Sequence, residues 1–404
     1  MSITRRSTLA GAGLLLATSP AVAATSVQIP FRVTRNRPWA ATTINRKDPV
    51  AFLIDTGSNV FGISNKAAKA HGLPRVTTGR VQGAVGRRDV VVYTANEIAI
   101  GGGAVRERDA VLVDTVSDDS DFIVGILPVA KWAIMGLDFD AQQLTVATRL
   151  SEGGAPEGYE ELTTYTQGES FGTMNRLGAN AIDAQHFQDL DQRPVIEAVF
   201  DGQPVKLMVD TGFQGMLFLF PDYVKKRGLW DHYPKHLDSG ISTIAGDAKT
   251  RTVRAEKLRI GRYGFATPIT VLGRPDDSDK DSVQDVQGVV GMEVLRRINF
   301  LHHPLRRRFY FKPSRAIQDV YRYNRGGMDA DVVGDHVRIT WIDPAGPAAK
   351  AGMKMSDKIV GWRGTDGFYG MLWALRGAPG TKVEIQVERA GAPTLVTVVL
   401  EDVI

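Results

Sequence analysis

The sequence predicts a mainly β protein with two homologous lobes, followed by a small α+β domain. Three observations support this prediction: an internal repeat in the first three quarters of the chain, short apolar runs separated by turn residues at intervals of about 8–12 positions, and a change of pattern near residue 326. The chain has 404 residues, with 42 glycines and 19 prolines. This length suits two to three domains of about 100–200 residues each. Closely spaced turns favour a barrel or a sandwich.

Composition excludes several classes of function. Cysteine is absent from the sequence, which excludes disulfides, thiolate metal sites, iron–sulfur clusters and cysteine nucleophiles. The formal net charge is +4, too little to suggest nucleic-acid binding. No cofactor and no metal is expected. Gly101-Gly102-Gly103 lacks the Lys-Ser/Thr that follows a phosphate-binding loop, and His302-His303 lacks the helical i, i+4 spacing of a zinc site.

Residues 1–23 have the features of an export signal. They combine a positive start, a short apolar run and a small-residue cleavage site. The pair Arg5-Arg6 is similar to a twin-arginine signal, although Thr8 stands where phenylalanine is usual, so an ordinary secretory signal stays open. No later stretch reaches the ~18 apolar residues of a membrane span. We therefore expect a periplasmic or secreted protein with no membrane span after signal removal.

The internal repeat relates residues 36–58 to residues 192–213. Three short motifs recur in the same order: Arg37-Pro38 with Arg193-Pro194, Pro49-Val50 with Pro204-Val205, and Asp55-Thr56-Gly57 with Asp210-Thr211-Gly212. Later matches keep this order, which indicates duplication of a unit of about 120–130 residues. We expect the lobes to span residues 24–150 and 151–325, and the last domain to span residues 326–404.

Within each unit, an apolar strand precedes Asp-Thr-Gly and a short helix follows it. The expected strands are 50–54, 90–93, 98–100 and 205–209, and the expected helices are 66–71 and 222–227. The joining segment 151–191 is polar and carries only weak strand signals.

The paired Asp-Thr-Gly motifs indicate acid–base chemistry. An apolar strand that ends in aspartate projects a carboxyl group from a rigid element, and the glycine permits a tight turn and close backbone approach. A pseudo-twofold axis between the repeats would bring Asp55 and Asp210 face to face. Two carboxylates about 3 Å apart share one proton. The ionised member then takes a proton from water and the protonated member donates to a carbonyl oxygen, with no metal and no covalent intermediate.

Residues ~35–312 resemble the aspartic proteases of the pepsin and retropepsin clan. The resemblance implies two β-barrel lobes with Asp55 and Asp210 as the catalytic dyad. It gives Thr56 and Thr211 hydrogen bonds that cross between the lobes, and Gly57 and Gly212 a close backbone approach under the dyad. A family element of two hydrophobic residues and a glycine is matched in the two lobes by Ile123-Val124-Gly125 and Val289-Val290-Gly291.

The resemblance also implies a glycine-rich hairpin flap over the substrate. The candidates are the segments around Gly83 and Gly86 in the first lobe and around Gly246 in the second. A flap in each lobe is closer to the symmetric retropepsin dimer than to pepsin, and neither candidate has the tyrosine of pepsins. A plain β-hairpin turn is the alternative.

One position departs from the family pattern. The family prefers a small residue after the glycine, and Ser58 fits, with a hydroxyl able to bond Asp55. The second lobe has Phe213 instead. We expect this ring to crowd the dyad or to desolvate Asp210, which raises a carboxyl pKa and makes the two aspartates unequal.

Residues 326–404 resemble a PDZ domain. Gly346-Pro347-Ala348-Ala349-Lys350-Ala351-Gly352 and Asp357-Lys358-Ile359 carry the match, with Ser356 in place of the usual glycine. PDZ domains bind the C-termini of other polypeptides by strand addition, with backbone N–H groups capturing the carboxylate. Gly326-Gly327-Met328 is only a vague candidate for that loop, so a structural cap without a ligand stays open. Helices near Pro347 and over 368–375, and strands over 337–342, 382–388 and 394–400, are expected.

These patterns give two main hypotheses. The first is an exported aspartic endopeptidase that cleaves peptides or proteins at acidic to mildly acidic pH, with a PDZ-like domain that binds a substrate tail or regulates access. One polypeptide holds both halves of the dyad, so a monomer suffices. The second is a catalytically inactive peptide-binding or scaffold protein of the cell envelope. A protease that acts only on itself or on one dedicated substrate is a third option.

Overall fold

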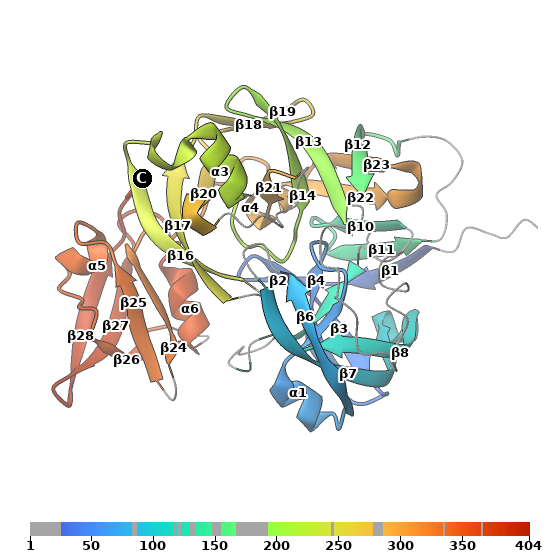
Figure 1. Cartoon of the computed structure of the whole chain (residues 1–404), viewed down its shortest axis with the longest axis horizontal. Coiled ribbons are helices and arrows are strands. Elements are labelled where there is room, and N and C mark those ends of the chain that lie inside the picture. The colour runs from blue at the N-terminus through green and yellow to red at the C-terminus, as the bar shows by residue number, and fades with distance from the viewer. Residues whose placement is uncertain are drawn as a thin grey trace, which may run out of the picture.

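The structure is a computed structural model. It describes residues 26–82, 87–116, 118, 123–129, 134–147, 155–166, 193–243, 246–277, 286–333, 336–364 and 367–404. Strands dominate, so the mainly β prediction is confirmed. Figure 1 shows two β lobes and a C-terminal unit that packs beside strands β16 and β17 of the second lobe.

The first lobe is an eight-stranded sheet in the order β2-β3-β4-β9-β5-β8-β7-β6. An additional pairing between β3 and β7 curls this sheet into a barrel. Its elements are β2 (Arg32–Thr34), β3 (Arg37–Ile44), β4 (Val50–Asp55), β5 (Phe61–Ile63), α1 (Asn65–Ala70), β6 (Arg75–Gln82), β7 (Arg87–Ile100), η1 (Gly101–Gly103), β8 (Val105–Val113) and β9 (Ile123–Pro128). The two strands expected at 90–93 and 98–100 are one strand, β7. No glycine or proline interrupts it, and β8 pairs along most of its length.

The second lobe repeats this order of elements. Its strands are β13 (Pro194–Phe200), β14 (Gln203–Val209), β15 (Leu217–Leu219), β16 (His236–Thr243), β17 (Gly246–Arg254), β18 (Lys257–Ile260), β19 (Tyr263–Ala266), β20 (Ile269–Gly273) and β21 (Gly288–Val290). Its helices are α3 (Pro221–Arg227), η3 (Leu229–Asp231), η4 (Pro275–Asp277) and α4 (Met292–Leu295). As in the first lobe, an apolar strand ends at an Asp-Thr-Gly turn, and a short strand and a helix follow.

A shared antiparallel sheet joins the lobes. The strands β1 (Ser26–Pro30), β11 (Gln143–Ala147) and β10 (Ile134–Asp138) come from the first lobe, and β22 (Ile298–His303), β23 (Arg308–Pro313) and β12 (Glu160–Thr166) from the second. The lobes meet where β10 pairs with β22, with Gly136 opposite Leu301. The hydrophobic core runs through both lobes. The two halves are therefore held in one relative position.

The C-terminal unit has its own five-stranded antiparallel sheet and its own core. Its elements are β24 (Met328–Val333), β25 (His336–Ile342), α5 (Pro347–Lys350), β26 (Lys358–Trp362), α6 (Gly367–Ala374), β27 (Lys382–Arg389) and β28 (Ala392–Val399). β24 is an edge strand and contacts β16 of the second lobe. In the described ranges, none of the helices combines the length and the apolar character needed to cross a membrane.

The C-terminal residues tie this unit to the lobes. Ile404 is buried in the hydrophobic core of the lobes. Asp402 accepts hydrogen bonds from the Tyr323 hydroxyl and from Nε of Arg325, both 2.8 Å long. The segment that enters the unit and the segment that leaves it therefore share one polar anchor.

Candidate active site

Each lobe ends a buried strand with an aspartate. Asp55 is the last residue of β4, and Asp210 directly follows β14. The turn after each strand folds back on its carboxyl group. The N–H of Gly57 donates to Oδ1 of Asp55 at 2.8 Å, and the N–H of Gly212 donates to Oδ1 of Asp210 at 2.7 Å. Each carboxyl is thus oriented by its own Asp-Thr-Gly turn.

The structure brings the two aspartates together. A Cβ added to Gly57 would lie 2.5 Å from Cγ of Asp210, and one added to Gly212 would lie 2.7 Å from Oδ2 of Asp55. Each glycine therefore leaves room for the aspartate of the opposite lobe. Both carboxyl groups open into a cavity of about 1480 Å³. Its lining comes from both lobes and from the C-terminal unit.

Reciprocal threonine hydrogen bonds lock the two turns. The N–H of Thr56 donates to the hydroxyl of Thr211, and the N–H of Thr211 donates to the hydroxyl of Thr56, both at 3.1 Å. Each hydroxyl then donates across the lobes, Thr56 to the Val209 carbonyl and Thr211 to the Ile54 carbonyl, both at 2.6 Å. Both threonines are fully buried. The four bonds obey the twofold symmetry of the repeat.

The two carboxyl groups are electrostatically unequal. Burial raises the pKa of Asp55 well above its usual range, and the neighbouring charge of Asp210 raises it further. Burial also raises the pKa of Asp210, but the N–H groups of Gly212 and Phe213, a hydrogen bond from Asp55 and the charge of Arg193 oppose the rise. Burial thus raises both pKa values, so the pair shares one proton, and the charge of Arg193 favours ionisation at Asp210.

Phe213 contacts Asp210 through its backbone, and its ring packs elsewhere. Its N–H donates to Oδ1 of Asp210 at 3.2 Å, which favours the ionised carboxylate. Its ring packs over two glycines, since a Cβ at Gly215 or Gly291 would lie 2.3 or 2.4 Å from ring atoms. Room for the ring comes from these glycines rather than from the dyad. Burial raises the pKa of Asp210, as expected, and the Phe213 N–H opposes that rise.

Ser58 differs from the expectation. Its hydroxyl donates to the carbonyl of Val60 at 2.8 Å. The single hydroxyl proton is thus used within the turn rather than on Asp55. The backbone N–H of Ser58 is the group that bonds Asp55 and opposes the rise of its pKa.

Strand pairing corrects the match of the hydrophobic-hydrophobic-glycine elements. In the second lobe, β21 lies parallel to β14, with Gly288 opposite Leu207 and Val290 opposite Val209. In the first lobe, β9 lies parallel to β4, with Gly125 opposite Phe52. Gly125 is therefore equivalent to Gly288.

The register places Ile126-Leu127-Pro128, not Ile123-Val124-Gly125, at the position of Val289-Val290-Gly291. The first-lobe match was three residues out of register. A glycine is required at position 125 for a different reason, because a Cβ there would lie 1.8 Å from the ring of Phe52. Two overlapping apolar patterns in one strand cannot be told apart without the partner strand.

The candidate flaps lie at the ends of two hairpins. β6 and β7 pair up to Gln82 opposite Arg87, and β16 and β17 pair up to Thr243 opposite Gly246. Gly83 and Gly86 lie outside the described residues, and Gly246 is the first residue of β17. Val81, Ile241 and Ala248 from these hairpins line the cavity.

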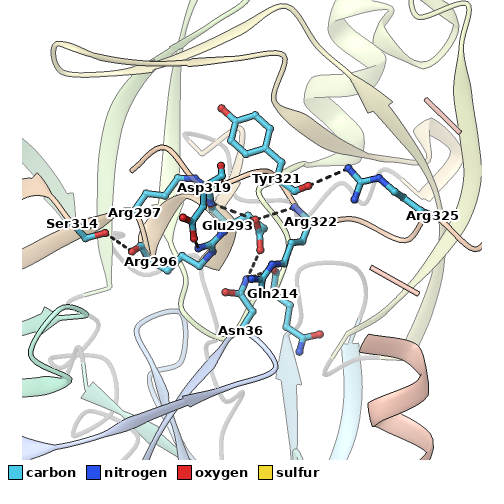
Figure 2. A network of polar contacts seen from close by, with 10 residues as sticks. All are labelled: Asn36, Gln214, Glu293, Arg296, Arg297, Ser314, Asp319, Tyr321, Arg322 and Arg325. Atoms are coloured by element: carbon cyan, nitrogen blue, oxygen red, sulfur yellow. Dashed lines mark hydrogen bonds and ion pairs between the residues drawn. The ribbon is translucent and has the colours of Figure 1, made fainter. Parts of the chain in front are cut away.

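Sequence reasoning missed a buried carboxylate in α4. Glu293 follows Val289-Val290-Gly291 and is 1% exposed. Figure 2 shows it at the centre of a polar network. It accepts hydrogen bonds from Nδ2 of Asn36 and from the N–H of Arg322, both at 3.1 Å, and forms an ion pair with fully buried Arg297 at 3.3 Å. It therefore links the first lobe, the second lobe and the segment that leads to the C-terminal unit.

Asn36 reaches this network from a tight turn. Arg35 and Asn36 have φ angles of 50° and 59° in the hairpin between β2 and β3, as the two-residue primed turns require. Nδ2 of Asn36 also donates to the Gln214 carbonyl at 2.9 Å, and Nε2 of Gln214 donates to the Arg35 carbonyl at 2.7 Å. The asparagine at this turn was the only sign of a polar contact in the sequence, but its partner Glu293 lies 257 residues away.

A family model matches a stretch in each lobe. The aspartyl protease family model matches residues 40–128 and 196–294, one stretch in each lobe. No curated protein sequence matches this one. Among solved structures, an aspartic proteinase from Irpex lacteus is similar over 73% of this chain and 99% of that chain, with 9% identity and a TM-score of 0.41. The family match in both lobes, together with the site, supports a hydrolase of the two-lobe aspartic protease class.

A metal centre has no support in the part of the chain that the structure describes. No group of three or more histidine, aspartate or glutamate side chains there could hold an ion.

Proposed function

We propose that this protein is an exported aspartic endopeptidase. One observation carries the proposal: two buried aspartates from opposite lobes face each other and are locked by reciprocal threonine bonds. Such a pair shares one proton, which supplies an acid and a base in one site.

The assigned reaction is hydrolysis of a peptide bond. Ionised Asp210 takes a proton from water, whose oxygen forms a bond to the peptide carbonyl carbon. Protonated Asp55 donates its proton to the carbonyl oxygen, which gives a tetrahedral gem-diol. When the C–N bond breaks, Asp210 returns its proton to the leaving nitrogen and Asp55 regains a proton from the gem-diol. Atoms and charge balance without a covalent intermediate.

The test uses the protein without residues 1–23 and unfolded casein at pH 3 to 7. Cleavage that pepstatin inhibits and that Asp55→Asn and Asp210→Asn each abolish is the expected result. Asp48→Asn is the matched control, because Asp48 is exposed and outside the cavity lining. Substantial cleavage by either dyad variant would contradict the assignment. A folded protein without turnover would favour the hypothesis of a peptide-binding envelope protein.

We also propose that the C-terminal unit is PDZ-like and acts on the same substrate. Its edge strand β24 follows Gly326 and Gly327, and its helix α6 lines the same cavity as the dyad. An edge strand next to a groove is what strand addition needs.

The proposal of export rests on residues 1–23, and it is tested by recovering the processed protein from the periplasm. Retention of an uncut N-terminus in the cytoplasm would contradict it.

A further inference from the structure

Each aspartate of the dyad faces an arginine of the adjacent strand. In the first lobe, Trp39 pairs with Leu53, and this register continued by two residues sets Arg37 opposite Asp55. In the second lobe, Val195 pairs with Met208, which sets Arg193 opposite Asp210 in the same way. The Arg-Pro motif of the repeat therefore belongs to the site.

The two arginines have different surroundings. Arg193 is 3% exposed, and its Nη1 donates across the lobes to the Gly57 carbonyl at 3.4 Å. Both arginines line the cavity, and among the described residues the buried Nε of Arg37 has no hydrogen-bond partner. Both therefore border the space where a substrate would lie, but Arg193 also bonds the other lobe.

The C-terminal unit supplies a second guanidinium to the same region. Arg376, which follows α6, lines the cavity, and its positive charge acts on Arg37. Burial lowers the pKa of Arg37, and the charge of Arg376 lowers it further, with Asp55 and Tyr369 opposing. The guanidinium carbons of Arg322 and Arg376 lie 5.6 and 5.7 Å from the centroid of the Trp373 ring.

The carboxylates near Arg376 are already engaged. Glu293 and Asp329 both interact with its charge. Glu293 is held by the network of Figure 2, and Asp329 accepts from Nδ2 of Asn324 at 3.1 Å. Two like charges that are withdrawn from water favour a counter-anion between them. A carboxylate suits guanidinium groups best, because its two oxygens match their paired N–H donors.

We propose that Arg37 and Arg376 form a substrate-carboxylate subsite beside the dyad, so that this protease prefers peptides with a carboxylate near the scissile bond. The inference rests on the proposed function and names its substrate class. The C-terminal unit is held in place by Asp402 and Ile404, so Arg376 forms part of a fixed wall of the cleft. Specificity then depends on one arginine from the first lobe and one from the C-terminal unit.

The test compares synthetic decapeptide mixtures. One mixture carries Asp and Glu at its degenerate positions, and a second carries Asn and Gln there. Each is made with a free and with an amidated C-terminus. We expect kcat/KM about tenfold higher for the acidic mixture, as a charged hydrogen-bonded pair supplies at least that factor. An effect of amidation alone would identify the peptide terminus as the source of the carboxylate.

Variants assign the preference to these residues. Arg37→Gln and Arg376→Gln should each bring the ratio of acidic to neutral rates, or of free to amidated rates, close to one. Arg376→Glu should favour a lysine-containing mixture. Arg32→Gln and Arg363→Gln are the controls, because both side chains are exposed and outside the cavity lining. Equal rates for all mixtures, or a preference that survives in both arginine variants, would overturn the subsite.

Binding separates this inference from the proposed function. Fluorescence anisotropy with Asp55→Asn measures the same four mixtures without turnover. If the wild-type protein cleaves nothing, tighter binding of carboxylate-bearing peptides that requires Arg37 and Arg376 still supports the subsite. Equal affinities would reject it.

Discussion

At the scale of single residues, the dyad depends on the neighbouring groups that favour or oppose ionisation of each carboxyl. In each turn, two backbone N–H groups favour ionisation of the carboxyl: those of Gly57 and Ser58 at Asp55, and those of Gly212 and Phe213 at Asp210. Asp210 also has the nearby charge of Arg193. The bulky residue after the second glycine therefore contributes through its backbone rather than through its ring.

The raised pKa of Asp55 predicts a pH-dependent effect of Asp55→Asn on folding stability. The folded pKa of Asp55 lies above its unfolded value of about 3.9, so folding stability falls as pH rises from about 4 toward the folded pKa. The variant removes this loss. Its Tm should exceed that of the wild type at pH 8, by about 2–4 °C for each kcal/mol relieved, and match it at pH 3.5. Calorimetry at both values measures this, and equal Tm differences would contradict it.

The threonine lock gives a second prediction at this scale. Thr211→Val keeps the shape but leaves the N–H of Thr56 and the carbonyl of Ile54 without their partner. We expect a loss of about 1–3 kcal/mol in the free energy of unfolding and a strong loss of kcat. Thr211→Ser keeps the hydroxyl and serves as the control. Urea unfolding of both variants measures this loss. A valine variant as stable as the wild type would contradict the role of the threonine hydrogen bonds.

At the scale of elements, α4 connects several parts of the molecule. Its Glu293 and the turn between β2 and β3 share a hydrogen bond across the lobes. Arg296, also paired with Glu293, bonds Asp319, and Arg297 lies 4.8 Å from the ring centroid of Tyr321. This short helix and the two arginines after it therefore link the turn between β2 and β3 to the segment that leads to the C-terminal unit.

Glu293→Gln tests this anchor. The variant leaves buried Arg297 without a charged partner, so we expect a loss of about 3–5 kcal/mol in the free energy of unfolding. Adding Arg297→Met should recover part of it, since no buried charge then stays unpaired. The surface pair Arg363–Glu384, 3.4 Å apart and 70% and 35% exposed, is the control. Breaking that pair should cost under about 1 kcal/mol. A similar cost at both sites would rule out the anchor.

At the scale of the whole molecule, the sheet between the lobes holds a buried histidine that should limit stability in acid. His302 lies in β22 opposite Met135 of the first lobe, and it is fully buried. Burial lowers its pKa to about 3, and neither ring nitrogen has a hydrogen-bond partner in the described part of the chain. The unfolded protein takes up a proton near pH 6.5, whereas the folded protein does not.

Stability should therefore fall as pH drops from about 6.5 toward 3, by up to about 1.4 kcal/mol per pH unit from this group. His302→Leu should flatten that slope, and His232→Leu, at an exposed histidine, should not. Urea unfolding at pH 4, 5 and 7 measures the slope. A slope unchanged by His302→Leu would contradict the prediction. Together with the raised pKa of Asp55, this limit predicts activity at mildly acidic rather than strongly acidic pH.

The sequence by itself determined what short-range patterns and repeats can carry. The duplicated Asp-Thr-Gly turns, the apolar strands before them and the helices after them follow from local turn chemistry and periodicity. The helices expected at 66–71 and 222–227 correspond to α1 and α3. The aspartates that the repeat singles out are the pair that the structure brings together.

The tertiary structure alone decided register and partnership. Gly125 and Ile126-Leu127-Pro128 exchange roles only when β9 is set beside β4. Arg37 and Arg193 match in sequence, yet they differ because the C-terminal unit stands on one side of the twofold axis only. The physical reason is the same in both cases. Register and the burial of charge depend on neighbours that are distant in sequence, and a local pattern carries no information about them.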